Sequence, residues 1–350
     1  MKGRVVAVDT LPDGREIAAL MVDGRIEDLL IDPPAVLGPV QPGAIFRAVV
    51  DRPLKGQGGV MVRLGDGQTG FLREAKGLSP GSELLVQVNT VAEKGKAAPV
   101  TTRILFKSRY AIVTPGKPGR NISRSIKDEA ERDRLAEIAN DAMMDAPVGL
   151  GLIVRSAADG VDDAAIADDI AQMVSLAQQV AEHGTAPELL VEALGAGELA
   201  WRDWADPDPD EVRIRPDSFE ELGLWDQVDQ LQQIDVPLGV SAWMSVEPTR
   251  ALVAVDINTG GNTSPAAGLK ANIAALRDLP RQLRLRGLGG QIVVDLAPFP
   301  KKERQVLEQT LRAALRKDSV ETTLAGWTPL GHMELQRKRE RRPLSEVLIK

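Results

Sequence analysis

The sequence predicts a mixed α/β protein of several domains, and three features lead to this prediction. Short strand patterns separated by Asp-Gly turns fill residues 1–38, as in a β-meander. Five more short strand patterns follow in residues 39–104. Further on, two apolar runs that end in Asp256 and Asp295 flank a helical stretch, which is the pattern of a right-handed β-α-β unit. A chain of 350 residues has room for about two or three domains.

The N-terminal meander is expected to contain three strands. Their patterns cover residues 3–9, 16–22 and 25–31. Pro33-Pro34 and the Gly- and Pro-rich stretch at residues 38–43 then mark a boundary, because such residues interrupt regular structure. We therefore expect the first layer to end near residue 38.

Residues 39–104 are predicted to form a small barrel of the OB type, because five short strands linked by Gly-rich turns are typical of it. The strand patterns lie at residues 45–51, 59–64, 69–72, 84–91 and 98–104. Phe71 lies in the third pattern, where a lone aromatic is more often a core residue than a stacking platform for bases. Lys96 lies on the loop after the fourth and is a candidate phosphate contact, although loop lysines are common on any surface.

Residues 105–187 combine an acidic amphipathic helix, an apolar strand and a second helix. The helices are predicted near residues 128–143 and 162–182, where apolar residues recur on one face. The strand between them ends in Arg155-Ser156, which places a guanidinium and a hydroxyl side by side. Such a pair can hold a phosphate monoester through a bidentate contact. The alternative is that Arg155 is a surface salt-bridge residue.

The strand pair that ends in Asp256 and Asp295 carries most of the predicted chemistry. Neighbouring strands lie about 4.8 Å apart, so carboxylates at the carboxyl ends of adjacent parallel strands can converge on one oxygen-ligand site. Asn258 lies on the same side of an extended chain as Asp256 and can add a carbonyl ligand. Mg²⁺ prefers such ligands and keeps open positions for phosphate oxygens. The alternative is that both acids merely cap strands at a solvated sheet edge.

The helical stretch between these two strands is expected to be broken. Ser264-Pro265 is a favourable helix start, whereas Pro280 removes a helix-interior hydrogen bond. A second helical piece is therefore predicted to begin at residue 278 or 279. Residues 301–317 are predicted to form one further amphipathic helix.

Composition excludes several other classes of protein. The sequence has no cysteine, which excludes disulfides and thiolate zinc sites. Its two histidines, His183 and His332, stand in unrelated contexts, so a Ser-His-Asp hydrolase is not expected and each histidine is interpreted as a surface or packing residue. No apolar run has the length of a membrane span and no leader peptide is evident, so we expect a cytoplasmic protein.

The net charge of −7 is unevenly distributed along the chain. Acidic residues gather between residues 159 and 220, whereas basic residues gather at 301–317 and 337–342. A basic run is usually a solvated helix face. Because these runs belong to the same unit as the predicted metal site, a track for a nucleic-acid phosphate backbone is the favoured interpretation.

Three sequence motifs in this unit recur together in a known family. They are Asp256-Ile-Asn258, then Arg281-Gln-Leu-Arg-Leu-Arg-Gly-Leu-Gly-Gly-Gln-Ile-Val-Val-Asp295, and finally Met333-Glu-Leu-Gln-Arg-Lys-Arg339. This region resembles the catalytic region of the bacterial ribonuclease E/G family. The family pattern is Asp-Ile-Asn, then Arg-Gln-Leu-Arg-Leu-Arg-x-Leu-Gly-Gly-x-Ile-x-x-Asp, then a basic Met-x-Arg-x-Arg helix. The ten residues from Arg281 are highly specific.

The resemblance implies four structural parts. Residues 1–38 and 188–234 together correspond to an RNase H-like subdomain, which is structural rather than catalytic in the family. The OB-fold barrel at 39–104 and a 5′-sensor region at 105–187 are inserted into it. Residues 235–350 correspond to a catalytic subdomain of DNase I-like architecture.

The resemblance also implies an activity, namely Mg²⁺-dependent cleavage of single-stranded RNA, with Mn²⁺ as a substitute and stimulation by a 5′-monophosphate. It implies that Asp256 and Asp295 hold the metal and that Asn258 helps to orient it. The matching positions for the 5′-phosphate pocket are Arg124, Arg155 and Ser156. The matching positions for RNA contacts are Phe71, Lys96, Arg281, Arg284, Arg286 and Arg337.

Three departures from the family pattern keep a second hypothesis open, a catalytically weak RNA-binding protein that retains the fold. Pro298 stands where the family usually has another acid, and Met61 stands where an aromatic is expected. Typical members continue into a Cys-Pro-x-Cys zinc link between two protomers, whereas this sequence stops shortly after residue 344. We therefore expect a short member with no structural zinc, in which packing holds any homodimer. The preserved aspartates favour the enzyme.

Overall fold

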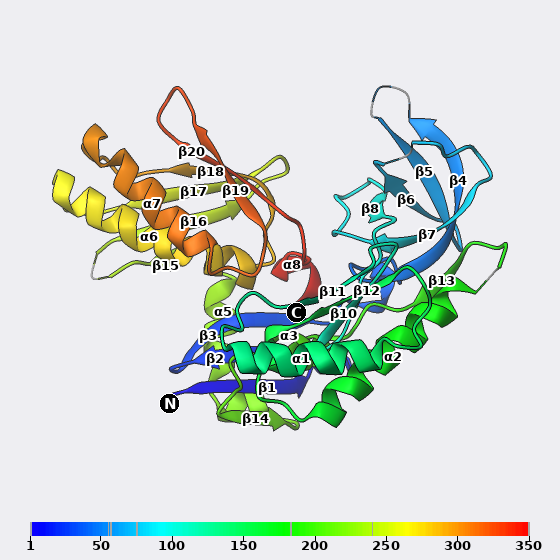
Figure 1. Cartoon of the computed structure of the whole chain (residues 1–350). Helices are drawn as coiled ribbons and strands as arrows, with labels where there is room; N and C mark the ends of the chain where they lie inside the picture. The colour runs from blue at the N-terminus through cyan, green and yellow to red at the C-terminus, as the bar shows by residue number, and fades with distance from the viewer. Residues whose placement is uncertain are drawn as a thin grey trace.

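The computed structural model contains four β-sheets with helices packed on them, and it describes residues 2–54, 56, 58–74, 76–182, 184–239 and 241–348. Figure 1 shows the C-terminal sheet and its helices at the upper left and the barrel at the upper right, with the other two sheets below. The predicted mixed α/β class is confirmed. Within the described residues, no helix combines the length and the apolar character that a membrane span requires.

The N-terminal meander forms the first sheet, in the order β14-β1-β2-β3. Its strands are β1 (Arg4–Thr10), β2 (Glu16–Val22), β3 (Arg25–Ile31) and β14 (Glu211–Ile214). Alternate residues point to opposite faces, so Val6 and Val8 pack with α3 (Ala196–Asp203), whereas Val5 and Ala7 pack with α4 (Ser218–Glu221) and α5 (Leu224–Leu231). The three meander strands are confirmed within one residue.

The second sheet is a barrel closed by the pairing of its first strand with a later one. After the short 3-10 helix η1 (Ala35–Leu37), its strands are β4 (Ile45–Leu54), β5 (Gly59–Gly65), β6 (Gln68–Leu72), β7 (Glu83–Val88) and β8 (Ala98–Thr101). The pairing β4–β7 closes the five strands, which confirms the OB-like barrel. The edge strand β13 (Glu188–Val191) pairs with β4, with Leu189 opposite Phe46. The resemblance grouped residues 188–234 with the first sheet, whereas Leu189 packs on the barrel core and Leu190 and Val191 pack on the core of the third sheet.

The third sheet has the order β11-β12-β10-β9 and is covered by two helices. Its elements are β9 (Phe106–Lys107), β10 (Ala111–Pro115), β11 (Gly119–Ile122), α1 (Glu129–Ala142), β12 (Leu150–Val154), η2 (Ser156–Ala158) and α2 (Asp163–Ala181). Both helices begin at aspartate N-caps, Asp128 and Asp162, whose carboxylates accept backbone N–H bonds. Both predicted helices are therefore confirmed.

The fourth sheet has the order β15-β16-β17-β18-β20-β19. Its elements are β15 (Asp235–Pro237), β16 (Trp243–Pro248), β17 (Val253–Asn258), α6 (Pro265–Leu285), β18 (Gly290–Asp295), η3 (Lys301–Glu303), α7 (Arg304–Leu315), β19 (Thr322–Trp327), β20 (Met333–Arg337) and α8 (Leu344–Val347). β17 and β18 run parallel around the crossover α6, as predicted. Residues 333–337 are a strand and not the basic helix of the family pattern.

Helix α6 continues through Pro280, so the predicted break after residue 277 is wrong. An interior proline costs roughly 3 kcal/mol. Leu276, Leu279 and Leu283 are fully buried on one face of α6, however, and each such side chain contributes about 1.5–3 kcal/mol on burial. Packing on both sides of the proline therefore outweighs the local cost. The boundaries predicted for the four parts stay predictions.

Candidate functional site

Asp256 and Asp295 face each other at the carboxyl ends of β17 and β18. The two residues are direct register partners in the parallel pair. Val255 and Val294 beside them point into the core with α6 and α7, so both aspartates lie on the opposite, open face of the sheet. The sequence prediction that these two carboxylates end adjacent strands is thus met in the fold, while their catalytic role stays a prediction.

Each aspartate is contacted by a polar side chain. Asn258 lies on the same face of β17 and donates from Nδ2 to Oδ2 of Asp256, at 2.8 Å. The Nδ1 atom of His332 lies 3.1 Å from Oδ1 of Asp295, whose side chain is 62% exposed. Both carboxylates are therefore oriented by the protein while remaining open to solvent.

The donor set fits a hard divalent cation. The part of the chain that the structure describes contains no cluster of three or more Asp, Glu, His or Cys side chains that could hold a metal ion. The available ligands are therefore the two carboxylates and the side-chain oxygen Oδ1 of Asn258. This oxygen accepts no hydrogen bond from the described residues. Oxygen ligands with one or two carboxylates and several waters are the usual environment of Mg²⁺.

The segment after Asp295 is held tightly against α6. The buried Asn272 donates from Nδ2 to the carbonyl of Ala297 at 2.8 Å and accepts from its N–H at 3.0 Å. A side chain at Gly268 would place its Cβ 2.0 Å from the Pro298 carbonyl oxygen, so only glycine permits this approach. The chain after the second aspartate is therefore packed closely on α6, although Pro298 offers no carboxylate there.

His332 is the site residue that the sequence interpretation missed. It was expected to be a surface or packing residue, but it reaches Asp295 because β20 pairs antiparallel with β18, with Met333 opposite Val294. Nothing in the local sequence reveals this pairing, since β20 follows β18 only after α7 and β19. Met333 is fully buried. His183 lies outside the described residues.

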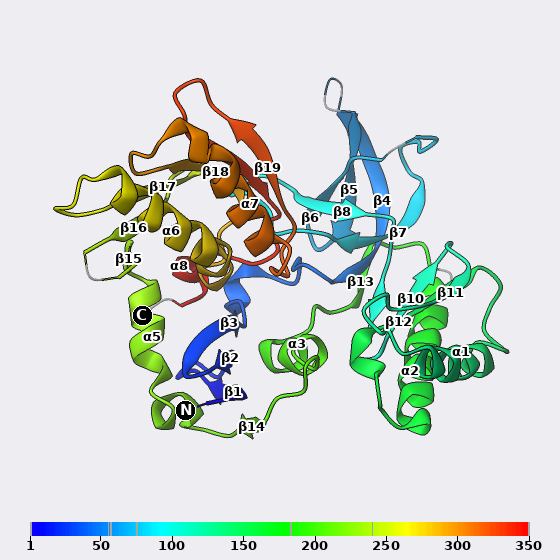
Figure 2. The ribbon, with the colours of Figure 1, turned by 60° about the vertical axis from the view of Figure 1, so that its left-hand side comes forward.

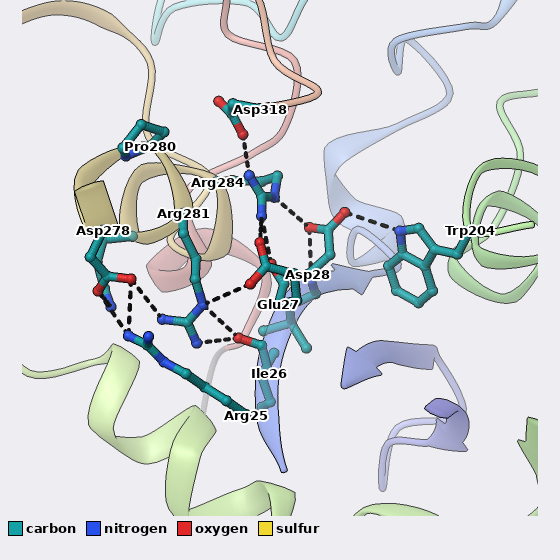
Figure 3. Close-up of polar contacts among 12 residues, drawn as sticks. Arg25, Ile26, Glu27, Asp28, Trp204, Asp278, Pro280, Arg281, Arg284 and Asp318 are labelled. Carbon is teal, nitrogen blue, oxygen red and sulfur yellow. Dashed lines mark hydrogen bonds and ion pairs between the residues drawn. The ribbon is translucent and has the colours of Figure 1, made fainter. Parts of the chain in front are cut away.

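The arginines of the 281–286 motif have protein partners, not open surface. Figure 3 shows Arg281 and Arg284 reaching from α6 to β3. The Nε atom of Arg281 donates to the Ile26 carbonyl at 2.8 Å, and Arg284 forms an ion pair with Glu27 at 2.7 Å. Arg286 donates to the carbonyl of Leu231 at 2.7 Å. All of these contacts join the C-terminal sheet unit to the first sheet unit.

Asp318 ties the same network to β20. Its carboxylate pairs with Arg284 and with Arg337, whose side chains are 7% and 1% exposed. Burial lowers the pKa of Arg337, and the charge of Asp318 opposes this. The structure therefore gives Arg281, Arg284, Arg286 and Arg337 buried contacts within the protein, and their RNA contacts stay predictions.

The glycines of the same motif have a packing role. Gly287 ends α6 with φ +64° and lies so close to the returning chain that a Cβ would be 1.9 Å from the Arg342 carbonyl oxygen. A Cβ at Gly290 would lie 2.2 Å from the Arg339 guanidinium. The specific Leu-Gly-Gly stretch is thus explained by the crossing of residues 338–342 over the end of α6.

The predicted 5′-phosphate residues leave the third sheet at one edge. β11 and β12 run parallel with Ile122 opposite Val154, so Arg124 and Arg155-Ser156 follow adjacent strand ends. Arg124 is exposed. The side chain of Arg155 is only 18% exposed and pairs with Asp203 at 3.0 Å. Burial lowers the pKa of Arg155, and the charge of Asp203 opposes this.

On the barrel, Phe71 lies on β6 opposite Met61 and Pro99 of the neighbouring strands, and its half-buried ring packs over Gly59. Lys96 is 68% exposed and pairs with Glu93 at 2.6 Å. Phe71 is thus only half-buried, whereas the charge of Lys96 is shared with a carboxylate. The RNA contacts predicted for Phe71 and Lys96 stay predictions.

Comparison with known proteins identifies the family. A model described as "Ribonuclease E/G family" matches residues 106–221 and 214–340. The chain belongs to the ribonuclease E/G family. Ribonuclease G of Escherichia coli (strain K12) is 28% identical over 97% of this chain and 81% of its own length. Ribonuclease G of Salmonella typhimurium is 29% identical with the same coverage, and ribonuclease E of Nostoc is 28% identical over 96% of this chain and 56% of its own length.

Family membership, as the sequence resemblance predicted, is thus established across almost the whole chain. At 28% identity the fold is shared, whereas each side chain has to be assessed in this structure. The absence of cysteine from the sequence means that these 350 residues cannot supply a thiolate zinc link.

Proposed function

We propose that this protein is a Mg²⁺-dependent endoribonuclease that cleaves single-stranded RNA in RNA processing or decay. The observation that carries the proposal is the register pairing of Asp256 with Asp295 on an open sheet face, in a chain of the ribonuclease E/G family. Names of relatives such as ribonuclease G support the reaction class.

The protein residues have separate tasks in this proposal. Asp256 and Asp295 hold the ion, Asn258 fixes Asp256 through its 2.8 Å bond, and His332 fixes Asp295 from the other side. When bound, Mg²⁺ supplies an activated water and stabilises charge on the phosphate. Open solvent around Asp295 leaves room for an RNA backbone.

The remaining predicted residues support RNA binding at two other places. We propose that Phe71 stacks a base on the barrel, with Lys96 nearby, and that Arg124, Arg155 and Ser156 receive a 5′-monophosphate. We further propose that the arginines of the 281–286 motif and Arg337 act mainly by holding the domains in position, which their contacts with protein acceptors support.

A metal-dependent cleavage assay tests the proposal. The substrate is a short 5′-monophosphorylated single-stranded RNA, incubated with Mg²⁺, with Mn²⁺, and with excess chelator. Cleavage within the strand that requires either ion is expected. Binding of the RNA without cleavage under all conditions would favour the second hypothesis, a non-catalytic RNA-binding protein, which Pro298 and Met61 support.

A further inference from the structure

A cationic side chain stands beside the Asp295 edge of the site without an acidic partner. Arg304 is exposed at the start of α7, and its guanidinium carbon lies 4.5 Å from the centre of the Trp327 ring. Among the described residues, Arg304 forms no ion pair, although most arginines of the C-terminal sheet unit do. Its charge is therefore available to a ligand.

The position of Arg304 is defined by the turn between β19 and β20. One of its terminal nitrogens lies 3.7 Å from the position that a Cβ at Gly331 would take. The next residue is His332, whose Nδ1 lies 3.1 Å from Asp295. Arg304 and the candidate metal ligand thus flank the same turn.

Trp327 is itself held in place. Its indole N–H donates to Glu308 at 2.6 Å, and its ring packs against Phe299 at a centroid distance of 6.2 Å. The Glu308 carboxylate thus accepts from the indole and pairs with Arg312 at 3.8 Å, and among the described residues it forms no ion pair with Arg304. Stacking on an aromatic face covers the guanidinium plane but leaves its N–H donors on the edge free.

We propose that Arg304, held by Trp327, binds an RNA backbone phosphate that neighbours the phosphate at Asp295. This inference rests on the proposed function. Two carboxylates at the site repel a phosphate, so a neighbouring fixed cation favours its approach. The free guanidinium edge matches phosphate oxygens in a bidentate manner. The exposed Lys301 and Lys302 extend the same positive surface.

Four variants test the inference: Arg304→Ala, Arg304→Lys, Trp327→Leu, and Arg277→Ala as the control. Arg277 is an exposed arginine on α6 that lies outside the proposed contacts. Two quantities are measured for each: the dissociation constant for single-stranded RNA in chelator over a salt series, and kcat/KM in Mg²⁺.

Arg304→Ala should weaken RNA binding and lower kcat/KM by about tenfold or more, and should reduce the salt dependence by roughly 0.7 in logarithmic slope. Arg304→Lys and Trp327→Leu should keep the slope, because the charge remains, but lose part of kcat/KM. Arg277→Ala should match the wild type.

The inference would be overturned if Arg304→Ala and Arg277→Ala had the same dissociation constant, salt dependence and kcat/KM. Arg304 would then only pack on the ring of Trp327. If the wild type binds RNA but does not cleave it, the proposed function fails, and the chelator series still decides the role of Arg304. If the wild type does not bind RNA, both fail.

Discussion

At the scale of single residues, the two strand-end aspartates show what a sequence can and cannot predict. Their proximity follows from two parallel strands and one crossover, which the apolar pattern alone predicts. The neighbour of Asp295 does not follow, because His332 arrives by an antiparallel pairing between strands far apart in the order of elements. The open face of the site was predictable, and its complete list of side chains was not.

Arg155 gives a prediction at the same scale. Arg155→Ala should narrow the difference in kcat/KM between 5′-monophosphorylated and 5′-hydroxyl RNA by about tenfold, because a charge-assisted bidentate contact contributes about 1.5–3 kcal/mol. Activity on 5′-hydroxyl RNA should change little. A thermal unfolding curve serves as the control, since Arg155 also pairs with Asp203.

Two results would contradict this prediction. One is a wild-type protein that shows no preference for the 5′-monophosphate. The other is an Arg155→Ala variant that keeps the full preference, which would leave Arg155 as a structural partner of Asp203.

At the scale of elements, α6 accounts for the most specific stretch of sequence. Its arginines bind β3, α5 and Asp318, and the glycines that follow allow residues 338–342 to cross closely. The family resemblance implied RNA contacts for these arginines. Only the packing of β3 and β20 against α6 reveals that the same arginines are buried, and sequence periodicity contains no information on that packing.

Asp318 and Glu27 allow this network to be tested with matched substitutions. Both carboxylates pair with Arg284, but the Asp318 side chain is 1% exposed and that of Glu27 is 43% exposed. Asp318→Asn should lower the free energy of unfolding by roughly 3–5 kcal/mol, because the buried Arg337 loses its carboxylate partner and Arg284 loses the most buried of its three. Glu27→Gln should lower it by less than about 1 kcal/mol.

Urea unfolding at neutral pH measures both values. If Asp318→Asn and Glu27→Gln lowered the free energy of unfolding by equally small amounts, Asp318 would not be an essential partner of Arg284 and Arg337. Because Asp318 lies away from the open face of the site, the residual activity of folded Asp318→Asn protein should remain dependent on Mg²⁺.

At the scale of the whole molecule, ion pairs hold the sheets together. Figure 2 shows α3 between the first and third sheets, where Asp203 pairs with Lys107 at 2.7 Å and with Arg155. Asp28 on β3 accepts from Trp204 at 3.0 Å and from Arg341 at 2.9 Å. The meander and barrel were predictable from local pattern, whereas these contacts between distant segments were not.

The same ion pairs predict a dependence of stability on pH. Burial raises the pKa of Asp28, but Arg341 and Arg284 outweigh it and hold the pKa below its ordinary value of 3.8. Burial likewise raises the pKa of Asp203, but Arg202 and Lys107 outweigh it and depress the pKa strongly. A depressed carboxyl pKa contributes stability that is present above the unfolded value and lost as pH falls through the folded value.

Stability from these two groups should therefore be constant from neutral pH to about pH 5 and should fall below about pH 4. Unfolding curves at a series of pH values measure this dependence. The free energy of unfolding of Asp203→Asn should decline less steeply between about pH 4 and pH 2 than that of the wild type. A protein whose stability does not change on acidification would contradict the assignment.

The central claim is that Asp256 and Asp295 form a metal-dependent site for RNA cleavage, and the most direct test compares cleavage with binding in one pair of variants. Asp256→Asn and Asp295→Asn should each lower the cleavage rate in Mg²⁺ by roughly a thousandfold or more, because loss of a metal ligand removes several kcal/mol of transition-state stabilisation. RNA affinity in chelator should be retained or slightly increased, because one repelling charge is removed, and the unfolding curve should match the wild type. Wild-type cleavage rates in either folded variant would contradict the account.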